Sequence, residues 1–365
     1  MSPSTVARLL GLGLTPGKLY GLQQISNSNG TLTMLAIDQN NSIIRMAHKY
    51  LAGRGEDRDP SYDEVVEYKL ELTREIAPAA SAVLLDAVYG AWNAVASFAI
   101  PRDTGLLVRV EESGAPRNPR GGYVGRVEPG WGVEKIKQMG AHAVKLLAQY
   151  EPTEPDSTEH QFTLAREIYD ACQWHDILFL LETTSYQFPG EDKASKSYLD
   201  RKAKTVIESA RHLSPFCDIY KAEFPGTLGH ESDAQLRENL QQLNAACQRP
   251  WVLLSAGVDF GAYRTQVEMA LEAGASGVLG GRAFWKEYFE QPSPDRMREF
   301  CRSEARGRVS AIDALVRERA KPWYGRYGLK ASDLTSFRAA EGWYYRYGAP
   351  APGDEFSDGG EGGDY

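Results

Sequence analysis

Three segments carry the clearest information about the fold: HAVKLLAQY (142–150), ILFLLETTSY (177–186) and DIYKAEFP (218–225). Each is a short, largely apolar run that is interrupted by an ionisable residue. Amphipathic stretches separate them, EHQFTLAREIYDACQWHD (159–176) and RKAKTVIESARHL (201–213). Short apolar runs that alternate with helical patterns are typical of parallel strands joined by helices. The middle of the chain is therefore predicted to be an α/β structure.

The same alternation extends in both directions and gives eight strand–helix units. The remaining strands are expected at 31–38, 81–86, 105–111, 250–257 and 276–285, and one of the helices at 63–79. Eight such units over residues 31–320 predict a closed (β/α)8 TIM barrel. An open doubly wound sheet is the alternative, but it requires a glycine-rich phosphate turn after its first strand. Asp38-Gln39-Asn40-Asn41 stands at that point instead, which favours the barrel.

The composition is that of a globular protein, because 42% of the 365 residues are hydrophobic and 25% are charged. The net charge of −8 argues against nucleic acid or an anionic membrane as the main partner. The four cysteines are widely spaced and form no CxxC pair, which suits a reducing compartment. The sequence has no long apolar run and no cleavage site after its start, so we expect a soluble cytoplasmic protein.

Segments on both sides of the barrel are expected to be appendages. Residues 1–30 form an N-terminal extension in this division, and 321–348 form an aromatic extension with two similar hexapeptides, WYGRYG (323–328) and WYYRYG (343–348). We interpret the hexapeptides as aromatic clamps onto the body, with a subunit contact or an active-site lid as alternatives. Residues 349–365 carry five of the negative charges and are predicted to be a disordered acidic tail.

Ionisable residues inside the predicted strands mark a candidate active site, because a buried charge is costly unless it is paired or functional. These residues are Lys145, Glu182, Lys221 and Glu223. Two close ammonium groups repel each other, which is expected to lower the pKa of at least one and to free a neutral amine. Such an amine attacks carbonyl groups, and a nearby glutamate can move protons. The set predicts Schiff-base chemistry, with structural ion pairs as the alternative and with the two lysines unranked.

The ends of other strands supply candidate substrate ligands. Asp38 and Asp86 end the first two strands and are expected to bond to substrate hydroxyls or to a lysine. Barrels often hold phosphate on backbone N–H groups after strands seven and eight. The chain has Ser255, Gly257, Gly280, Gly281 and Arg282 there. The six histidines form no ligand pattern, so no metal or other cofactor is predicted, and His142 is expected to face the surrounding helices.

At this point the chain resembles a known family. The segments TMLAIDQ, SAVLLDAVYG, GAHAVKLLAQY, FLLETTSY, DIYKAEFP, VLLSAGV and GVLGGRAFW are similar, in this order, to class I tagatose 1,6-bisphosphate aldolases and the related sulfofructose-phosphate aldolases. The resemblance implies a metal-independent lyase that reversibly cleaves a ketohexose 1,6-bisphosphate to dihydroxyacetone phosphate and glyceraldehyde 3-phosphate. It places the Schiff-base lysine on Lys221, a second active-site lysine on Lys145 and a catalytic glutamate on Glu182. The substrate-binding positions that it implies are Asp38, Gln39, Ser255, Gly257, Gly280 and Arg282.

One departure from these aldolases bears on the substrate. They often have arginine after Asp-Gln, where this chain has Asn40, and Arg109, Arg120 or Arg126 are candidates to replace its charge. Two other interpretations stay open at this stage. One is a different barrel enzyme on a phosphorylated sugar, such as a sulfosugar-phosphate aldolase, an isomerase or a transaldolase. The other is a non-catalytic sugar-phosphate sensor. The sugar epimer and the oligomeric state are not determined by the sequence, and a homo-oligomer is compatible with the aromatic extension.

Overall fold

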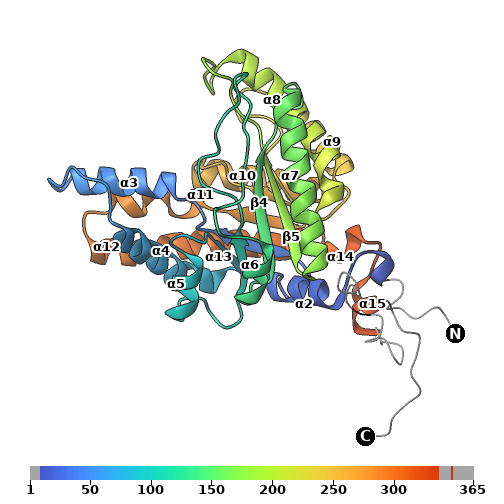
Figure 1. Ribbon diagram of the computed structural model, residues 1–365, viewed down its shortest axis with the longest axis horizontal. Coiled ribbons are helices and arrows are strands. Elements are labelled where there is room, and N and C mark those ends of the chain that lie inside the picture. The colour runs from blue at the N-terminus through green and yellow to red at the C-terminus, as the bar shows by residue number, and fades with distance from the viewer. Residues whose placement is uncertain (1–8, 337–346, 348–365) are drawn as a thin grey trace, which may run out of the picture.

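The computed structural model describes residues 9–336 and 347 of the chain. Its centre is a closed barrel of eight parallel strands that pair in chain order, with β8 next to β1 (Figure 1). The strands are β1 (Leu32–Ala36), β2 (Ala82–Leu85), β3 (Gly105–Arg109), β4 (Ala143–Gln149), β5 (Leu178–Thr184), β6 (Ile219–Ala222), β7 (Trp251–Leu254) and β8 (Gly277–Gly280). The predicted TIM barrel is confirmed.

Helices surround the barrel and connect its strands (Figure 1). Those before β5 are α2 (Pro16–Ile25), α3 (Asn41–Ala52), α4 (Tyr62–Ile76), α5 (Ala91–Ala96), α6 (Val133–Gln138) and α7 (Pro155–Trp174). Those after it are α8 (Lys196–Leu213), α9 (Asp233–Ala246), α10 (Phe260–Ala273), α11 (Arg282–Trp285), α12 (Pro294–Phe300), α13 (Arg306–Arg319), α14 (Trp323–Arg326) and α15 (Ala331–Ser336). No helix within 9–336 is both long and apolar enough to cross a membrane.

Alternation along the strands separates an inner core from an outer one. The inner core is built from every second strand residue, among them Met34, Leu84, Leu107, Leu180 and Ile219. The opposite strand faces pack against the helices and form the larger outer core. Because inward positions recur every two residues, the next inward positions toward the strand C-termini include Lys145, Glu182 and Lys221. The apolar layer therefore lies directly beneath the ionisable residues.

The N-terminal end of the barrel is closed by both appendages. The apolar residues of α2 join the inner core, and so do Trp323 and Tyr327 of the first hexapeptide. Lys18 of α2 is fully buried, and its Nζ donates to Asp218 at 2.8 Å. Residues 1–30 were predicted to be an extension, and the role of α2 in closing this end of the barrel was not predicted. The first hexapeptide packs onto the body as a clamp would, whereas 343–346, 348 and the tail lie outside the described residues.

The junction between β8 and β1 requires a glycine at position 277. Gly277 has φ of 150°, and a Cβ there would lie 1.8 Å from the carbonyl oxygen of Leu32. The substitution Gly277→Ala should lower the free energy of unfolding by about 3 kcal/mol or more, because both the backbone and the strand pairing are forced to shift. Gly307 in α13 is exposed with no atom near its Cβ position, so Gly307→Ala should stabilise by about 0.5–1 kcal/mol. Urea denaturation of both variants measures the contrast, and equal effects would contradict it.

Candidate active site

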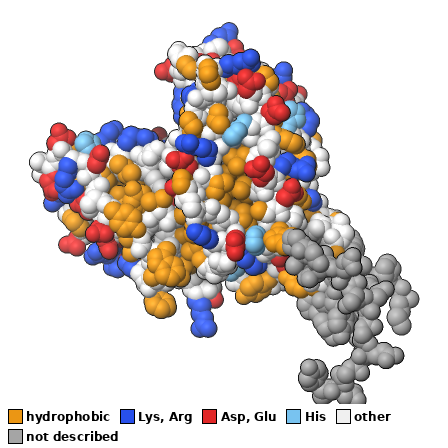
Figure 2. All heavy atoms as spheres, in the orientation of Figure 1, with side chains coloured by type: hydrophobic (Ala, Val, Ile, Leu, Met, Phe, Trp, Pro, Cys, Tyr) orange, Lys and Arg blue, Asp and Glu red, His pale blue; other side chains and the backbone are white. Residues whose placement is uncertain are grey.

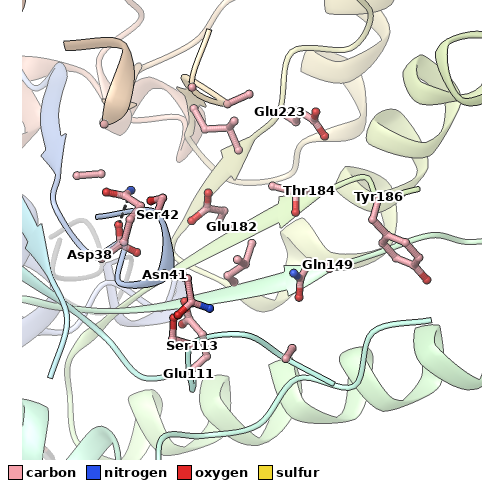
Figure 3. Close-up of a pocket in the computed structure, with 18 of the residues that line it drawn as sticks. Asp38, Asn41, Ser42, Glu111, Ser113, Gln149, Glu182, Thr184, Tyr186 and Glu223 are labelled. Atoms are coloured by element: carbon pink, nitrogen blue, oxygen red, sulfur yellow. Dashed lines mark hydrogen bonds between the residues drawn. The ribbon is translucent and has the colours of Figure 1, made fainter. Parts of the chain in front are cut away.

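A cavity of about 410 Å³ opens at the C-terminal ends of the strands. Eight of the ten predicted catalytic and substrate-binding residues line this cavity. These eight are Asp38, Gln39, Lys145, Glu182, Lys221, Ser255, Gly257 and Arg282. In Figure 3, Glu182 on β5 points toward the side of the cavity where Asp38 lies, while Glu223 points elsewhere. The cavity lies where barrel enzymes carry their active sites.

Lys145 is the centre of the charged cluster in this cavity. Its Nζ lies 2.9 Å from Asp38 Oδ2, 2.7 Å from Glu111 Oε1 and 3.0 Å from Glu182 Oε2. Burial by itself would lower the pKa of Lys145, but the three carboxylates outweigh it and raise that pKa above the ordinary range for lysine. Lys145 is therefore protonated at neutral pH.

Glu182 connects the two lysines. Glu182 of β5 and Lys221 of β6 are direct register partners, and Lys221 Nζ lies 3.0 Å from the same Glu182 Oε2 that contacts Lys145. Burial raises the pKa of Glu182, but Lys145 and Lys221 together lower it below its ordinary value. Asp38 is lowered in pKa in the same way, against burial, mainly by Lys145 and Lys221. Both carboxylates are ionised at neutral pH.

The sequence predicted a lowered pKa for at least one of the two lysines, and Lys145 is not that one. Its pKa is raised because three carboxylates surround its ammonium group. Asp38 and Glu111, both beyond the ends of their strands, turn inward and add two negative charges. Lys221 contacts one carboxylate of this cluster, Glu182, where Lys145 contacts three. The two lysines therefore lie in different electrostatic surroundings.

A second network of polar contacts lies beside the cluster and is centred on Glu223, two residues after Lys221. Glu223 Oε1 is 3.2 Å from Lys202 of α8, and its Oε2 accepts from Ser185 N at 2.8 Å and Ser185 Oγ at 2.7 Å. Ser185 Oγ also lies 2.9 Å from Tyr198 OH. This network ties the loop after β5 and the start of α8 to the barrel mouth.

Two arginines form a basic end to the cavity. Arg282 begins α11 and Arg45 lies on α3, and neither guanidinium has a hydrogen-bond or ion-pair partner among the residues that the structure describes. Burial, and then the charge of Arg45, lowers the pKa of Arg282. Gly257 has φ of 76° and lies against the guanidinium, since a Cβ there would be 3.1 Å from Arg282 Cζ. Gly281 N donates to Ser255 Oγ at 3.1 Å. Two unpaired cations beside small residues are suited to an anion.

Two of the predicted substrate ligands do not line the cavity. Asp86 is fully buried behind its wall, where it pairs with Lys69 of α4 and accepts from Tyr89 N at 2.8 Å. The buried ammonium of Lys69 needs a counter-charge, so the lysine option for Asp86 is the one that the structure shows. Gly280 lies at a strand position that faces the helices, where a Cβ would lie 2.5 Å from the Phe284 ring. Its place in the cavity is taken by the neighbouring Gly281.

Asn40 also contacts Lys69, the buried partner of Asp86. Lys69 Nζ donates to Asn40 Oδ1 at 2.7 Å and to the Ile37 carbonyl at 3.0 Å, which holds the segment that carries Asp38. Of the three arginines considered as replacements for the missing charge, Arg109 lines the cavity and donates to the Asp38 carbonyl at 2.7 Å. The other two, Arg120 and Arg126, have exposed side chains that do not line the cavity, and they pair with Asp156 and Glu112, respectively.

Sequence reasoning missed Glu111, Arg45 and Lys69. A signal existed for Glu111, because Leu107, Arg109 and Glu111 are two residues apart and share the inward face of β3. A signal existed for Lys69 too, since it lies four residues after Val65 on the apolar face of α4. Arg45 is one turn beyond the start of α3, a helix that the sequence analysis did not identify. His142 lies outside the cavity, and its Nδ1 accepts from Leu106 N at 3.0 Å.

Residues 32–287 match the profile of the DeoC/LacD family aldolases. The chain belongs to this family of aldolases. Curated relatives include the tagatose 1,6-diphosphate aldolase of Listeria monocytogenes, 30% identical over 86% of this chain and 96% of the relative. The Staphylococcus aureus protein of the same name is 28% identical over 85% of this chain and 98% of the relative. The family match spans all eight strands of the barrel and the residues of the Lys145 cluster.

Solved structures with the same fold are more distant in sequence. An archaeal fructose 1,6-bisphosphate aldolase superposes with a TM-score of 0.55 at 17% identity, over 82% of this chain and 99% of that chain. The fructose-bisphosphate aldolase of Slackia heliotrinireducens gives a TM-score of 0.56 at 13% identity, over 94% and 98%. These likenesses concern the barrel itself. Within the described residues, no group of three or more His, Cys, Asp and Glu side chains is arranged to hold a metal ion.

The Lys145 cluster makes a prediction for stability against pH. In the wild type, Asp38 and Glu182 have lowered pKa values, so they stabilise the folded state at any pH above their pKa in the unfolded chain. Lys145 has a raised pKa, so it stabilises the folded state at any pH below its ordinary pKa of 10.5. The free energy of unfolding should therefore be nearly constant from about pH 5 to about pH 8. The substitution Lys145→Met leaves three buried carboxylates with less compensation and should cost about 3–5 kcal/mol at neutral pH.

Acidification should rescue the Lys145→Met protein. Without the Lys145 ammonium, the buried carboxylates of the variant are expected to have raised pKa values and to take up protons on folding. Protonation then favours the folded state at low pH, so the variant should be more stable at about pH 5 than at about pH 8. Urea denaturation at both pH values measures this difference. Lys204 is an exposed lysine with 76% of its side chain accessible, and Lys204→Met is the control that should change neither value. A Lys145→Met protein without acid rescue would contradict the assigned charges.

Proposed function

We propose that this chain is a class I aldolase that uses Lys221 to form a Schiff base and cleaves tagatose 1,6-bisphosphate. The observation that carries the proposal is the geometry of Glu182, whose Oε2 lies 3.0 Å from both Lys221 and Lys145. One lysine is fixed as a cation by three carboxylates, and the other shares a single carboxylate that can receive its proton. That division of roles is what imine formation requires.

The proposed reaction begins when Lys221 passes a proton to Glu182 and its free amine attacks the C2 ketone. Loss of water gives an iminium ion, which withdraws electrons from the C3–C4 bond. Glu182 gives its proton to the hydroxyl group that leaves as water and then takes the proton of the C4 hydroxyl. The C3–C4 bond breaks, which releases glyceraldehyde 3-phosphate and leaves an enamine on Lys221. Protonation of the enamine by Glu182 and hydrolysis release dihydroxyacetone phosphate. In this scheme Lys145, 3.0 Å from Glu182, orients it and supplies a positive charge.

The cavity also suits a phosphorylated sugar in its binding groups. Buried polar atoms without a hydrogen-bond partner include Gln39 Oε1, Ser42 Oγ, Arg109 Nε and Glu111 Oε2, and all four residues line this cavity. A ligand with several hydroxyl groups would satisfy such atoms. The unpaired guanidiniums of Arg45 and Arg282 favour an anionic group at the basic end. The names of the relatives at 30% and 28% identity support tagatose 1,6-bisphosphate among the ketose bisphosphates.

Reductive trapping tests the nucleophile. Borohydride added with dihydroxyacetone phosphate should attach the ligand irreversibly to Lys221, and peptide mapping by mass spectrometry locates the adduct. Lys221→Ala should form no adduct and should lose about a thousandfold or more in cleavage rate. The exposed control Lys204→Met should be trapped as the wild type is. An adduct on Lys145, or none at all, would refute the assignment. The same run with tagatose, fructose and sulfofructose phosphates ranks the substrates.

Arg45 should supply the charge that Asn40 does not. The substitution Arg45→Gln should raise KM for the bisphosphate about tenfold or more and change kcat little, because a charge-assisted contact to a non-reacting phosphate is lost. Lys49 lies one turn further along α3, is exposed and does not line the cavity, so Lys49→Gln is the matched control. Steady-state kinetics with a coupled assay measure both parameters. An unchanged KM in Arg45→Gln would exclude Arg45 from the phosphate site.

A further inference from the structure

An apolar face lies on the surface beside the barrel, at the start of α4 and along the segment from β2 through α5. It consists of Tyr62, Val88, Trp92, Ala96 and Phe98, here called the α5 face. The residues are exposed to 52% at Tyr62, 66% at Trp92 and 92% at Phe98. Figure 2 shows hydrophobic side chains gathered over the region of α4 and α5. Apolar side chains gathered in this way commonly mark an interaction site.

The sequence of this segment has the composition of an interface. Residues 87–101 contain no Lys, Arg, Asp, Glu or His, in a chain of which 25% is charged. Trp92 and Ala96 lie one helical turn apart on the exposed side of α5. Depletion of charge together with enrichment of aromatic residues distinguishes the centre of a protein interface from ordinary surface. The α5 face shares both properties.

The α5 face is also held in a defined shape. Tyr62 OH donates to the Val88 carbonyl at 3.1 Å, and Asn93 Nδ2 donates to the Tyr89 carbonyl at 3.0 Å and to Tyr62 OH at 3.3 Å. Phe98, the most exposed of the group, has a backbone φ of 55°. This left-handed conformation costs roughly 1 kcal/mol for a residue with a bulky side chain. The hydrogen bonds fix the Tyr62 side chain, which therefore loses little side-chain entropy when it is covered.

We propose that a second copy of this chain docks on the α5 face, across a two-fold axis, to form a homodimer. The three aromatic residues expose roughly 400 Å² on one protomer, taking about 200 Å² for each. A two-fold contact doubles this area, and Val88, Ala96 and a polar rim bring the total toward the roughly 1,200 Å² of a stable interface. A self-complementary apolar patch without charge fits an isologous contact, because like charges would otherwise face each other across the axis.

Other occupants fit the α5 face less well. The segment 349–365 of this chain carries five carboxylates and no basic residue, which is a poor match for an uncharged aromatic surface. An anionic bilayer attracts lysine and arginine, which residues 87–101 lack. In the aromatic extension, Trp323 and Tyr327 are buried against their own barrel, so the α5 face rather than the first hexapeptide is available for a subunit contact.

The dimer would rest on the same elements that support the active-site wall. Tyr89 follows Val88, and its ring centroid lies 5.2 Å from that of Tyr62. Lys69 Nζ lies 5.8 Å from the Tyr89 ring on the other side, and Tyr89 N donates to Asp86 at 2.8 Å. A subunit packed on Tyr62 and Val88 would therefore restrain the cluster that holds Asn40 and the segment of Asp38. The contact is continuous from the surface to the cavity wall.

Sedimentation velocity of the full chain from about 1 µM to about 100 µM tests the proposal. The wild type should sediment at twice the 40.4 kDa chain mass, and the double variant Trp92→Glu/Phe98→Glu should weaken self-association about a hundredfold or more, to a monomer. Trp174 is exposed to 48% on α7, and the control Trp174→Glu should remain dimeric. A monomeric wild type, or a dimeric double variant, would overturn the proposal.

A second measurement keeps the test independent of the folding of the double variant. The four native cysteines are buried, so an introduced surface cysteine is selectively reactive. Ser97 is exposed between Ala96 and Phe98, and Ser97→Cys treated with a short bismaleimide should give a covalent dimer. Ser303, which is exposed in the connection between α12 and α13 and is not part of the α5 face, provides the control Ser303→Cys, which should stay monomeric on a denaturing gel. No cross-link at position 97, or equal cross-linking at both positions, would refute the α5 face as the contact.

Discussion

The contact between the Lys145 ammonium and three carboxylates is the constraint on which the rest of the site depends. Desolvation of four charges inside a barrel is costly, and the cluster persists because each acid lies within 3.0 Å of the ammonium. The three acids come from β5 and from the segments after β1 and β3, so one cation fixes three separate parts of the barrel mouth.

This arrangement explains why two lysines in one cavity differ in chemistry. Lys145 is surrounded by acids on neighbouring strands and keeps its proton, whereas Lys221 meets the cluster at its edge through Glu182 alone among these acids. The carboxylate that joins them lies in register with Lys221, so strand pairing sets the distance between Glu182 and Lys221. A substrate carbonyl placed over Lys221 would meet a fixed positive field from Lys145 on one side. The field stabilises an anionic or electron-rich reaction centre, as preorganised charges do in enzymes generally.

The fold and the centre of the site could be predicted from the sequence because both depend on period-two patterns within single strands. Lys145, Glu182 and Lys221 interrupt apolar runs, and their parity is visible in the residue order. Positions beyond the strand ends were harder, since the chain there turns freely. Asp86 and Asp38 occupy similar places after β2 and β1, yet the first turns outward to Lys69 and the second inward to Lys145. Only the three-dimensional placement of these two lysines distinguishes the two aspartates.

Both ends of the barrel carry buried charged groups, but these groups differ in whether they have partners. At the N-terminal end, the buried pair of Lys18 and Asp218 is covered by α2 and α14, and Asp218 also accepts from Phe179 N at 2.8 Å. Both charges of this pair are thus satisfied, which is what a purely structural pair requires. At the C-terminal end, Gln39, Ser42, Arg109 and Glu111 keep buried atoms without hydrogen-bond partners, and two arginines have no counter-charge among the described residues. Unsatisfied groups of this kind cost stability unless a ligand pairs with them. The contrast within one barrel therefore separates the end that supports the fold from the end that is built to bind.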